Sequence, residues 1–313
     1  VWYYGETHNI TWIAHGTLDP VTLQYSVDNK QNWVNINTNV PGGDYGDSPI
    51  SYEWTIPDRN SEQCFIRVTD NTFSTITDDS DADFSIRPTI TVTQPLLNTN
   101  ITVLSSGNPI RWSCSSSTSV TNVDIGYAVG GGTSYTIVAT NIPMAQGTSY
   151  VWDDVPDNMN SLAQIKVADA LPGGGTGNQN VSGLSPTFHL VGGLTLTAPQ
   201  GSSTNWEATA TDKNISWTKT GTGLTAVNLY YSANSGSSYT FITSVSADAS
   251  PYNWSGMPTF ISNTVSNTAR VKVEDANNAS IYDASDSDFH IIGKFTITSP
   301  PDNGNVLTAD AGY

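Results

Sequence analysis

Apolar and polar residues alternate with a period of two along three separate stretches of the chain. In each stretch, every second residue is apolar or aromatic: Val21, Leu23, Tyr25 and Val27, then Val123, Ile125, Tyr127 and Val129, then Val227, Leu229, Tyr231 and Ala233. Because a strand points successive side chains to opposite faces, this pattern predicts β-strands with one buried face. No stretch carries a sustained helical stripe bounded by caps, so we expect an all-β chain.

Five sequence blocks recur three times in the same order. Each copy has an ITW-like block, a strand–turn–strand block, a Y-x-W block, an R-V-x-D-like block and an F-x-I-like block, and the copies open with NITW at 9–12, PIRW at 109–112 and NISW at 214–217. Repeats of roughly 100 residues with about seven short strands are typical of Ig-like or fibronectin-like β-sandwiches. We therefore expect three tandem Ig-like β-sandwich modules at 1–88, 89–191 and 192–293, followed by a strand segment at 294–313.

Two tryptophans recur in every copy, at strand positions that face inward. They are Trp12 and Trp54, Trp112 and Trp152, and Trp217 and Trp254. We interpret these six side chains as core aromatics packed between two sheets. The two cysteines, Cys64 and Cys114, also lie at inward positions of alternating patterns, and we expect them to be free, buried thiols.

The repeats are out of phase with the chain. An apolar strand that ends in proline precedes the second and third ITW-like blocks, at 89–95 and 195–200, and a third such strand at 296–301 has no module after it. The first module begins instead with a half-strand, Val1 to Tyr4. A sandwich that lacks an edge strand exposes unpaired backbone groups, which makes that edge a site for strand addition.

The unmatched strand predicts what fills the incomplete module. We expect a self-assembly strand of one copy to complete the first module of the next copy. This strand comprises Phe295, Thr296, Ile297, Thr298 and Val306, and the acceptor residues are Val1, Tyr3 and Trp12. We expect Val306 to take the register of Val103 and Val1. Such contacts run head to tail, and repeated head-to-tail contacts build open filaments. The alternative is one long polypeptide in which the neighbouring units are covalently continuous.

Composition narrows the expected partners. Lys and Arg number 11 against 28 Asp and Glu, so the formal net charge is −17. Nucleic acids and anionic membrane surfaces attract basic patches, and we expect neither as a partner. No run approaches the ~18 apolar residues of a membrane span, so we expect no membrane insertion. The chain begins with Val1 and carries no leader pattern, from which we expect a processed product or an excerpt.

No group of residues predicts catalysis, and we expect neither enzymatic activity nor a bound cofactor. A catalytic histidine needs a nucleophile beside it, and no serine has a nucleophile-elbow or S-x-x-K context, so we expect no catalysis by His8, His15, His189 or His290. A Ca²⁺ site is one possible expectation, because oxygen-rich segments recur along the chain. Their carboxylates are Asp78, Asp79, Asp81 and Asp83, then Asp283, Asp286 and Asp288, and finally Asp70, Asp169 and Asp275. No D-x-D-x-D-G loop is present, and solvated acidic turns are the alternative.

The turn SVDNKQNW at 26–33 resembles an Asp-box, and SANSGSSY at 232–239 and AVGGGTSY at 128–135 are looser copies. The whole repeat, with its ITW-like, Y-x-W, R-V-x-D-like and F-x-I-like blocks, resembles the Ser/Thr-rich Ig-like domain at the N-terminus of yeast cell-wall glucan-assembly proteins and its relatives in bacterial surface proteins. The Asp-box resemblance implies a structural hairpin. The domain resemblance implies a modular, extracellular protein, and neither carries over a catalytic residue.

Three functions remain as hypotheses for an extracellular or cell-surface protein. The first is a structural subunit or segment of an extracellular filament or surface stalk, whose partner is another copy of itself. The alternative is an adhesin or glycan-binding module array that binds surface glycans through loop aromatics such as Tyr45, Trp206 or Tyr252. A non-catalytic spacer of a large enzyme is a third reading.

Overall fold

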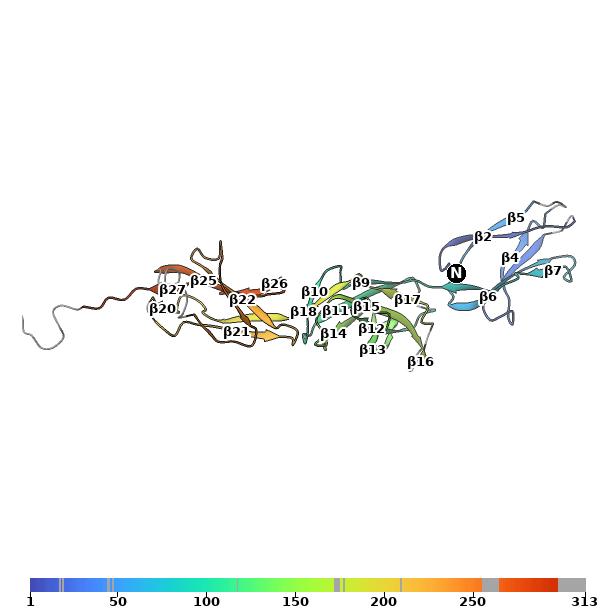
Figure 1. Cartoon of the computed structure of the whole chain (residues 1–313). Helices are drawn as coiled ribbons and strands as arrows, with labels where there is room; N and C mark the ends of the chain where they lie inside the picture. Colours follow the sequence, from blue (N-terminus) through green and yellow to red (C-terminus); the bar gives the residue numbers. More distant parts are fainter. Residues whose placement is uncertain are drawn as a thin grey trace, which may run out of the picture. The chain divides into compact units, whose positions relative to one another are not determined.

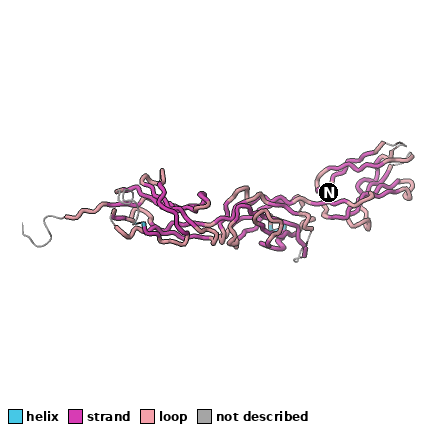
Figure 2. The backbone as a smooth tube through the Cα atoms, viewed as in Figure 1, coloured by secondary structure: helices cyan, strands magenta, loops and turns pink. Residues whose placement is uncertain are grey.

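The computed structural model describes residues 1–16, 18, 20–43, 46, 48–116, 118–171, 175–176, 178–208, 210–254 and 265–297. The regular structure of these residues is almost entirely β-strand, and a short 3₁₀ turn lies at Met144–Gln146 (Figure 2). Strands β1–β8, β9–β18 and β19–β27 form three tandem Ig-like β-sandwiches (Figure 1), which we call modules 1, 2 and 3. Within the described residues, no helix has the length and apolar character needed to cross a bilayer.

Module 1 has a large and a small sheet. The large sheet has the order β1 (Trp2–Tyr3), β8 (Phe84–Arg87), β6 (Ser61–Asp70), β3 (Val21–Ser26) and β4 (Val34–Val40), and β7 (Thr77–Asp79) also pairs with β6. The small sheet contains β2 (Thr7–Trp12) and β5 (Ile50–Thr55). The inward positions Leu23 and Ile86 are fully buried, as the alternating pattern predicts.

Module 2 repeats this plan with one more strand in its small sheet. Its large sheet has the order β10 (Asn100–Thr102), β18 (Phe188–Val191), β15 (Asn160–Leu171), β12 (Asn122–Ala128) and β13 (Thr136–Pro143), with β16 (Gly175–Thr176) and β17 (Ser182–Leu184) also paired to β15. Its small sheet has the order β14 (Ser149–Trp152), β11 (Asn108–Cys114) and β9 (Ile90–Gln94). Val123 and Ile125 of β12 have no exposed surface.

Module 3 has the same two-sheet arrangement. Its large sheet has the order β20 (Asn205–Glu207), β27 (Phe289–Ile292), β25 (Ser266–Asp275), β22 (Ala226–Ser232) and β23 (Thr240–Ser246), and β26 (Asn278–Ala284) pairs with β25. Its small sheet has the order β19 (Gly193–Ala198), β21 (Asn214–Thr220) and β24 (Tyr252–Asn253). Val227 and Leu229 of β22 are fully buried in its core.

An aromatic pair joins the two sheets of every module. A tyrosine of the large sheet packs on the tryptophan of the Y-x-W block, with ring centroids 5.2 Å apart for Tyr25 and Trp54, 5.5 Å for Tyr127 and Trp152, and 5.2 Å for Tyr231 and Trp254. Such tilted contacts suit aromatic quadrupoles and add to the area that the rings bury. Five of the six recurrent tryptophans are buried, which confirms their interpretation as core residues, and Trp12 is the exception.

Short polar turns connect the central hairpins. In the turn between β3 and β4, Ser26 Oγ accepts a hydrogen bond from the Lys30 amide at 3.0 Å and Asp28 Oδ1 accepts one from the Asn32 amide at 2.8 Å. In the turn between β22 and β23, Ser232 Oγ and Asn234 Oδ1 accept the equivalent hydrogen bonds from the amides of Gly236 and Ser238. These side chains satisfy turn amides that no strand partner reaches.

The chain divides into two compact units. The first contains most of modules 1 and 2, namely residues 1–101, 105–154 and 160–190. The second contains module 3 together with residues 102–104 and 155–159, which sequence order assigns to module 2. Segments at one end of module 2 therefore pack as part of the module 3 unit.

Candidate functional site

The small sheet of module 1 has a free edge. One edge of β2 pairs with β5, and no strand among the described residues pairs with the other edge. In modules 2 and 3 the corresponding strands, β11 and β21, each pair with an additional strand, β9 and β19. Module 1 is thus one strand short of the arrangement that the same chain builds twice.

The additional strand covers the tryptophan of the ITW-like block. Val92 of β9 lies opposite Trp112, and Leu196 of β19 lies opposite Trp217. These tryptophans are only 2% and 4% exposed. Trp12, at the same position of module 1, is half-buried because no described strand pairs with its side of β2, although its Nε1 donates to the carbonyl of Gly42 at 3.2 Å. Trp12 packs against the core of module 1, as the interpretation of a core aromatic expects, but it is less buried than its counterparts because the described structure lacks the strand that covers them.

A groove of about 930 Å³ follows this free edge. Ile10 and Trp12 of β2 form one wall, and Ile76 and Asp78, in and next to β7, lie on the other. The inward side chains of the large sheet reach its floor, among them Val21, Ile66 and Val68. The groove therefore offers both an unpaired strand edge and apolar side chains, which are the two features that strand addition requires.

In module 2 the equivalent space holds β9, which lies against β17. The fit is close, because a Cβ at Gly183 of β17 would lie 2.3 Å from the carbonyl oxygen of Ile90. Glycine is required there to let the two backbones approach. In module 3, β19 lies in the same way against β26.

The segment that matches β9 and β19 in sequence follows β27. The aligned segments read ITVTQP from Ile90, LTLTAP from Leu194 and FTITSP from Phe295. Phe295 is fully exposed and Ile297 is 75% exposed, whereas Ile90, Val92 and Leu196 are at most 5% exposed. Thr296 lies between them without a strand partner in the described chain, and Thr298 and Val306 lie outside the described residues.

The first residues of the chain form part of the large sheet. Strand β1 runs parallel to β8, with Trp2 opposite Ile86 and Tyr3 opposite Arg87. Val1 is 59% exposed and Tyr3 is 40% exposed, and neither lines the groove, although Trp2 does. Of the expected acceptor residues, only Trp12 therefore lies in the groove.

The expected register of this half-strand needs a correction. The Tyr4 amide donates to the carbonyl of Arg87 at 3.0 Å, just as the Val103 amide donates to the carbonyl of Val191 at 2.9 Å. Tyr4, and not Val1, is therefore the counterpart of Val103. A half-strand of two or three residues is too short for the alternating pattern to fix its register.

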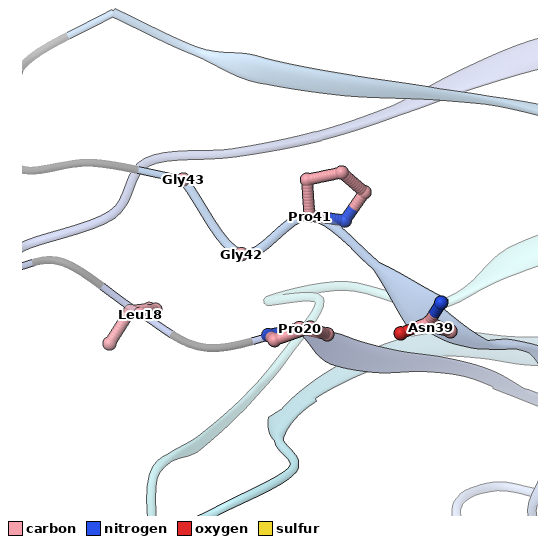
Figure 3. A pocket seen from close by; sticks show the side chains of 6 residues that line it. All are labelled: Leu18, Pro20, Asn39, Pro41, Gly42 and Gly43. Carbon is pink, nitrogen blue, oxygen red and sulfur yellow. The ribbon is translucent and has the colours of Figure 1, made fainter.

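A smaller cavity of about 400 Å³ lies at the loop end of module 1, between the segment of Leu18 and Pro20 and the segment of Pro41, Gly42 and Gly43 (Figure 3). Leu18 stands three residues before the first central strand of module 1, where modules 2 and 3 have Val120 and Leu224. Both counterparts are fully buried, whereas Leu18 is half-buried. Module 1 thus leaves open a second apolar position that the later modules cover.

The loop after the Y-x-W strand of module 1 is bonded to module 2. The Asp58 carboxylate accepts hydrogen bonds from the hydroxyls of Ser116, at 2.7 Å, Thr118 and Ser119. Burial alone would raise the pKa of Asp58, but these three hydroxyl donors hold it below its usual value.

A second set of bonds reinforces the same joint. Asn178 donates from Nδ2 to Asn60 Oδ1 at 2.8 Å and to Glu62 Oε1 at 2.6 Å, and Asn60 donates to Asp169 Oδ2 at 2.9 Å. Glu62 also forms a bidentate pair with Arg87, at 2.8 and 2.7 Å. Arg87, with Asn178 and Ser85 as further donors, lowers the pKa of Glu62 to about 2.

The joint recurs at the equivalent turn of module 2. Both carboxylate oxygens of Asp157 accept from the Thr222 amide, at 3.1 and 3.0 Å. Met159 packs beside this contact, where a Cβ at Gly223 would lie 2.8 Å from its sulfur. Asp58 and Asp157 both follow the proline of the Y-x-W block, so one turn makes the same kind of contact twice.

Several of the candidate metal and catalytic residues are engaged with other partners. Asp79 pairs with Arg67 at 2.6 Å and with Lys30 at 3.2 Å, and Asp288 pairs with Arg270 at 2.6 Å. Over the described part of the chain, no three His, Cys, Asp or Glu side chains gather in a way that could hold a metal ion. His8 stacks on Trp2, with ring centroids 4.6 Å apart, and His189 Nδ1 lies 2.8 Å from the carbonyl of Ser161.

The two described candidates for glycan binding, Trp206 and Tyr252, pack against the core of module 3. Trp206 lies in β20 and packs on Trp254 and Phe289, with ring centroids 6.0 and 4.8 Å apart. Tyr252 is half-buried against the same core, and Tyr45 lies outside the described residues. The interpretation of Trp206 as a loop aromatic is wrong, because its short strand pairs in parallel with β27 and turns the ring inward.

Both cysteines are free in the structure, Cys64 buried and Cys114 half-buried. Burial raises the pKa of each thiol, which keeps it protonated near neutral pH.

No protein-family model matches the chain, and no curated protein does. Similar solved structures include the fibronectin(III)-like modules of Clostridium thermocellum CbhA, at 13% identity and a TM-score of 0.22, with 65% of this chain and 94% of that chain covered. They also include a tetra-tandem repeat in the extending region of a large adhesion protein, at 14% identity and a TM-score of 0.34, with 92% and 74% covered. Extracellular domains 3–5 of Drosophila OTK match at 9% identity and a TM-score of 0.34, with 94% and 93% covered.

Proposed function

We propose that this chain is a structural element of an extracellular surface or adhesion array, in which copies join head to tail by strand addition. The segment that begins at Phe295 of one copy fills the groove of module 1 in the next. The observation that carries the proposal is the contrast at one position: Trp112 and Trp217 are covered by an added strand, and among the described residues Trp12 has no such strand. The groove beside Trp12 lies in module 1 at the position that β9 and β19 occupy in modules 2 and 3.

The energetics favour occupation of the groove. Phe295 and Ile297 are exposed apolar side chains, and burial of each stabilises the assembly by about 1.5–3 kcal/mol. Pairing with β2 adds ladder hydrogen bonds, each with a net contribution of about 1 kcal/mol. These gains oppose the entropy lost on association, so a groove with several ladder bonds supports a stable contact.

The joints support a structural role. Asp58 and Asp157 each accept hydrogen bonds inside one compact unit, from Ser116 and from Thr222 respectively, at the turn after the Y-x-W block. The acidic surface, with a net charge of −17, keeps such arrays apart in solution. These features suit a spacer or stalk, since none of them requires a small-molecule ligand.

Measurement of the mass distribution of the full chain tests the proposal. We expect wild-type protein to form oligomers that lengthen with concentration, seen by light scattering and negative-stain imaging, and the Ile297→Asp variant to remain monomeric. The matched control is Ile137→Asp, which places the same charge at a 61% exposed isoleucine of module 2 away from the groove. A wild-type chain that stays monomeric at all concentrations, or oligomers that survive in Ile297→Asp, would overturn the proposal.

A further inference from the structure

We infer that the groove of module 1 accepts the incoming strand in one register, with Ile297 opposite Trp12 and its backbone amide bonded to Asp78. This inference rests on the proposed function and specifies its partner, the segment Lys294–Ile297 of a second copy and the residues that follow it.

The register comes from the two internal examples. Val92 lies opposite Trp112 and Leu196 lies opposite Trp217, and both align with Ile297 in the shared strand pattern. One step along, Thr91 lies opposite Ser113 and Thr195 opposite Thr218. The corresponding pair in the assembly is Thr296 opposite Ile13, an exposed residue next to Trp12.

Asp78 has a counterpart that already makes the inferred bond. In module 3, Asp283 of β26 lies opposite Val273 of β25, and its Oδ2 accepts the amide of Leu196 in β19 at 2.7 Å. In module 1, Asp78 of β7 lies opposite Val68 of β6. The two strand pairs correspond, because Val273 lies opposite Leu229 just as Val68 lies opposite Leu23. Asp78 is exposed and lines the groove, so its carboxylate is available to an entering strand.

Module 2 shows the alternative at this position. Gly183 lies opposite Val167, and its missing side chain lets the backbone of Ile90 approach directly. Module 1 carries the aspartate of module 3 and not the glycine of module 2. The incoming strand therefore contacts β7 through a carboxylate, as β19 contacts β26.

The charges of the two surfaces are complementary. Asp78 and Asp81 line the groove beside Asp79, whose charge is already paired with Arg67 and Lys30. The entering segment carries Lys294 and has no acidic residue from Gly293 to Pro301. The pair that Lys294 makes with Glu207, at 3.3 Å, joins two exposed side chains and contributes little, so its loss does not prevent docking.

Disulfide trapping tests the register in the full chain. We expect Ile13→Cys/Thr296→Cys to form disulfide-linked chains under mild oxidation, seen as a ladder on non-reducing gels. The matched control, Ile13→Cys/Thr298→Cys, represents a two-residue slip that keeps the same face outward, and it should not cross-link. Both variants retain Cys64 and Cys114. A ladder from the slipped pair alone would overturn the register while leaving strand addition in place.

Peptide binding tests Asp78 separately. The Ile297→Asp chain has an empty groove and cannot donate a competent strand, so it serves as the receptor for a labelled peptide of residues 293–301. We expect Asp78→Ala in this background to weaken binding about tenfold or more, as loss of a charged acceptor does, and Asp78→Asn to retain part of the affinity. Asp83→Ala removes the same charge outside the groove and should change binding less than twofold.

The outcomes separate the two proposals. No binding of the peptide to the Ile297→Asp chain would overturn strand addition itself. Binding that Asp78→Ala and Asp83→Ala weaken equally would leave strand addition standing and overturn the role of Asp78.

Discussion

The carboxylate of Asp58 accepts a hydrogen bond from the hydroxyl of Ser116 at 2.7 Å, across the boundary between two sandwiches. Thr118 and Ser119 donate to the same carboxylate. One side chain of the first module thus organises the loop that follows Trp112 in the second. The arrangement makes Asp58 a positioning residue for the joint, with no part in the core of either sandwich.

Substitution of Asp58 by alanine should loosen this loop. Three hydroxyls lose their acceptor and turn to water, and because Asp58 is partly exposed we expect a loss of about 1–2 kcal/mol in the local opening free energy. The amides of Thr118 and Ser119 donate hydrogen bonds to Ser116 Oγ, so their hydrogen exchange reports the change directly. Asp154→Ala removes an exposed carboxylate elsewhere and serves as the control. Unchanged protection of these amides in Asp58→Ala would contradict the assigned role.

Acid should weaken the same joint through Glu62. Its pKa falls from an ordinary 4.5 to about 2 in the folded chain, chiefly because Arg87 bonds to the ionised form. A carboxyl group whose pKa is lower in the folded chain than in the unfolded chain stabilises the fold fully at a pH above its unfolded pKa. This stabilisation is lost as the pH falls toward its folded pKa. The contribution of Glu62 should therefore disappear between about pH 4.5 and pH 2.

Burial raises the pKa of Asp169, which faces the same joint, so protonation of that group acts in the opposite direction and softens the overall loss. The readout is therefore a difference between variants. We expect the gap in melting temperature between wild type and Glu62→Gln to be largest at pH 6 and to close near pH 2, while Glu53→Gln, an exposed control, shows no such trend. A gap that does not vary with pH would refute the assignment.

The alternating pattern was sufficient to identify the inward residues Leu23, Ile125 and Leu229, because a period of two depends only on local geometry. The repeats also identified the segment from Phe295 as the sequence match of β9 and β19. The sequence could not reveal the bond from Asp58 to Ser116, since a contact between distant polar side chains leaves no periodic pattern. It also misplaced Trp206, because a three-residue strand in a parallel pair is too short to alternate visibly.

A methyl group at Gly183 should destabilise module 2. The added Cβ would lie 2.3 Å from the carbonyl oxygen of Ile90, and backbone cannot move aside as a flexible side chain can. We expect Gly183→Ala to lower the free energy of unfolding by about 1–3 kcal/mol, as overpacking commonly does. Gly46→Ala, where a Cβ meets open space, is the matched control in urea titrations. Equal midpoints for the two variants would show that β9 does not need this close approach.

Removal of the Trp206 ring distinguishes a core residue from a binding platform. The ring packs on Trp254 and Phe289, so Trp206→Ala should leave a void and lower the free energy of unfolding by about 2–3 kcal/mol, somewhat less than for a fully buried tryptophan. Trp206→Phe should recover much of the loss because it refills part of the space. Phe73→Ala truncates a 61% exposed aromatic and should have little effect. If Trp206→Ala were as stable as wild type and instead abolished binding on a glycan array, the side chain would act at the surface. The packing of Trp206 against two core rings leads us to expect instead a clear loss of stability in Trp206→Ala.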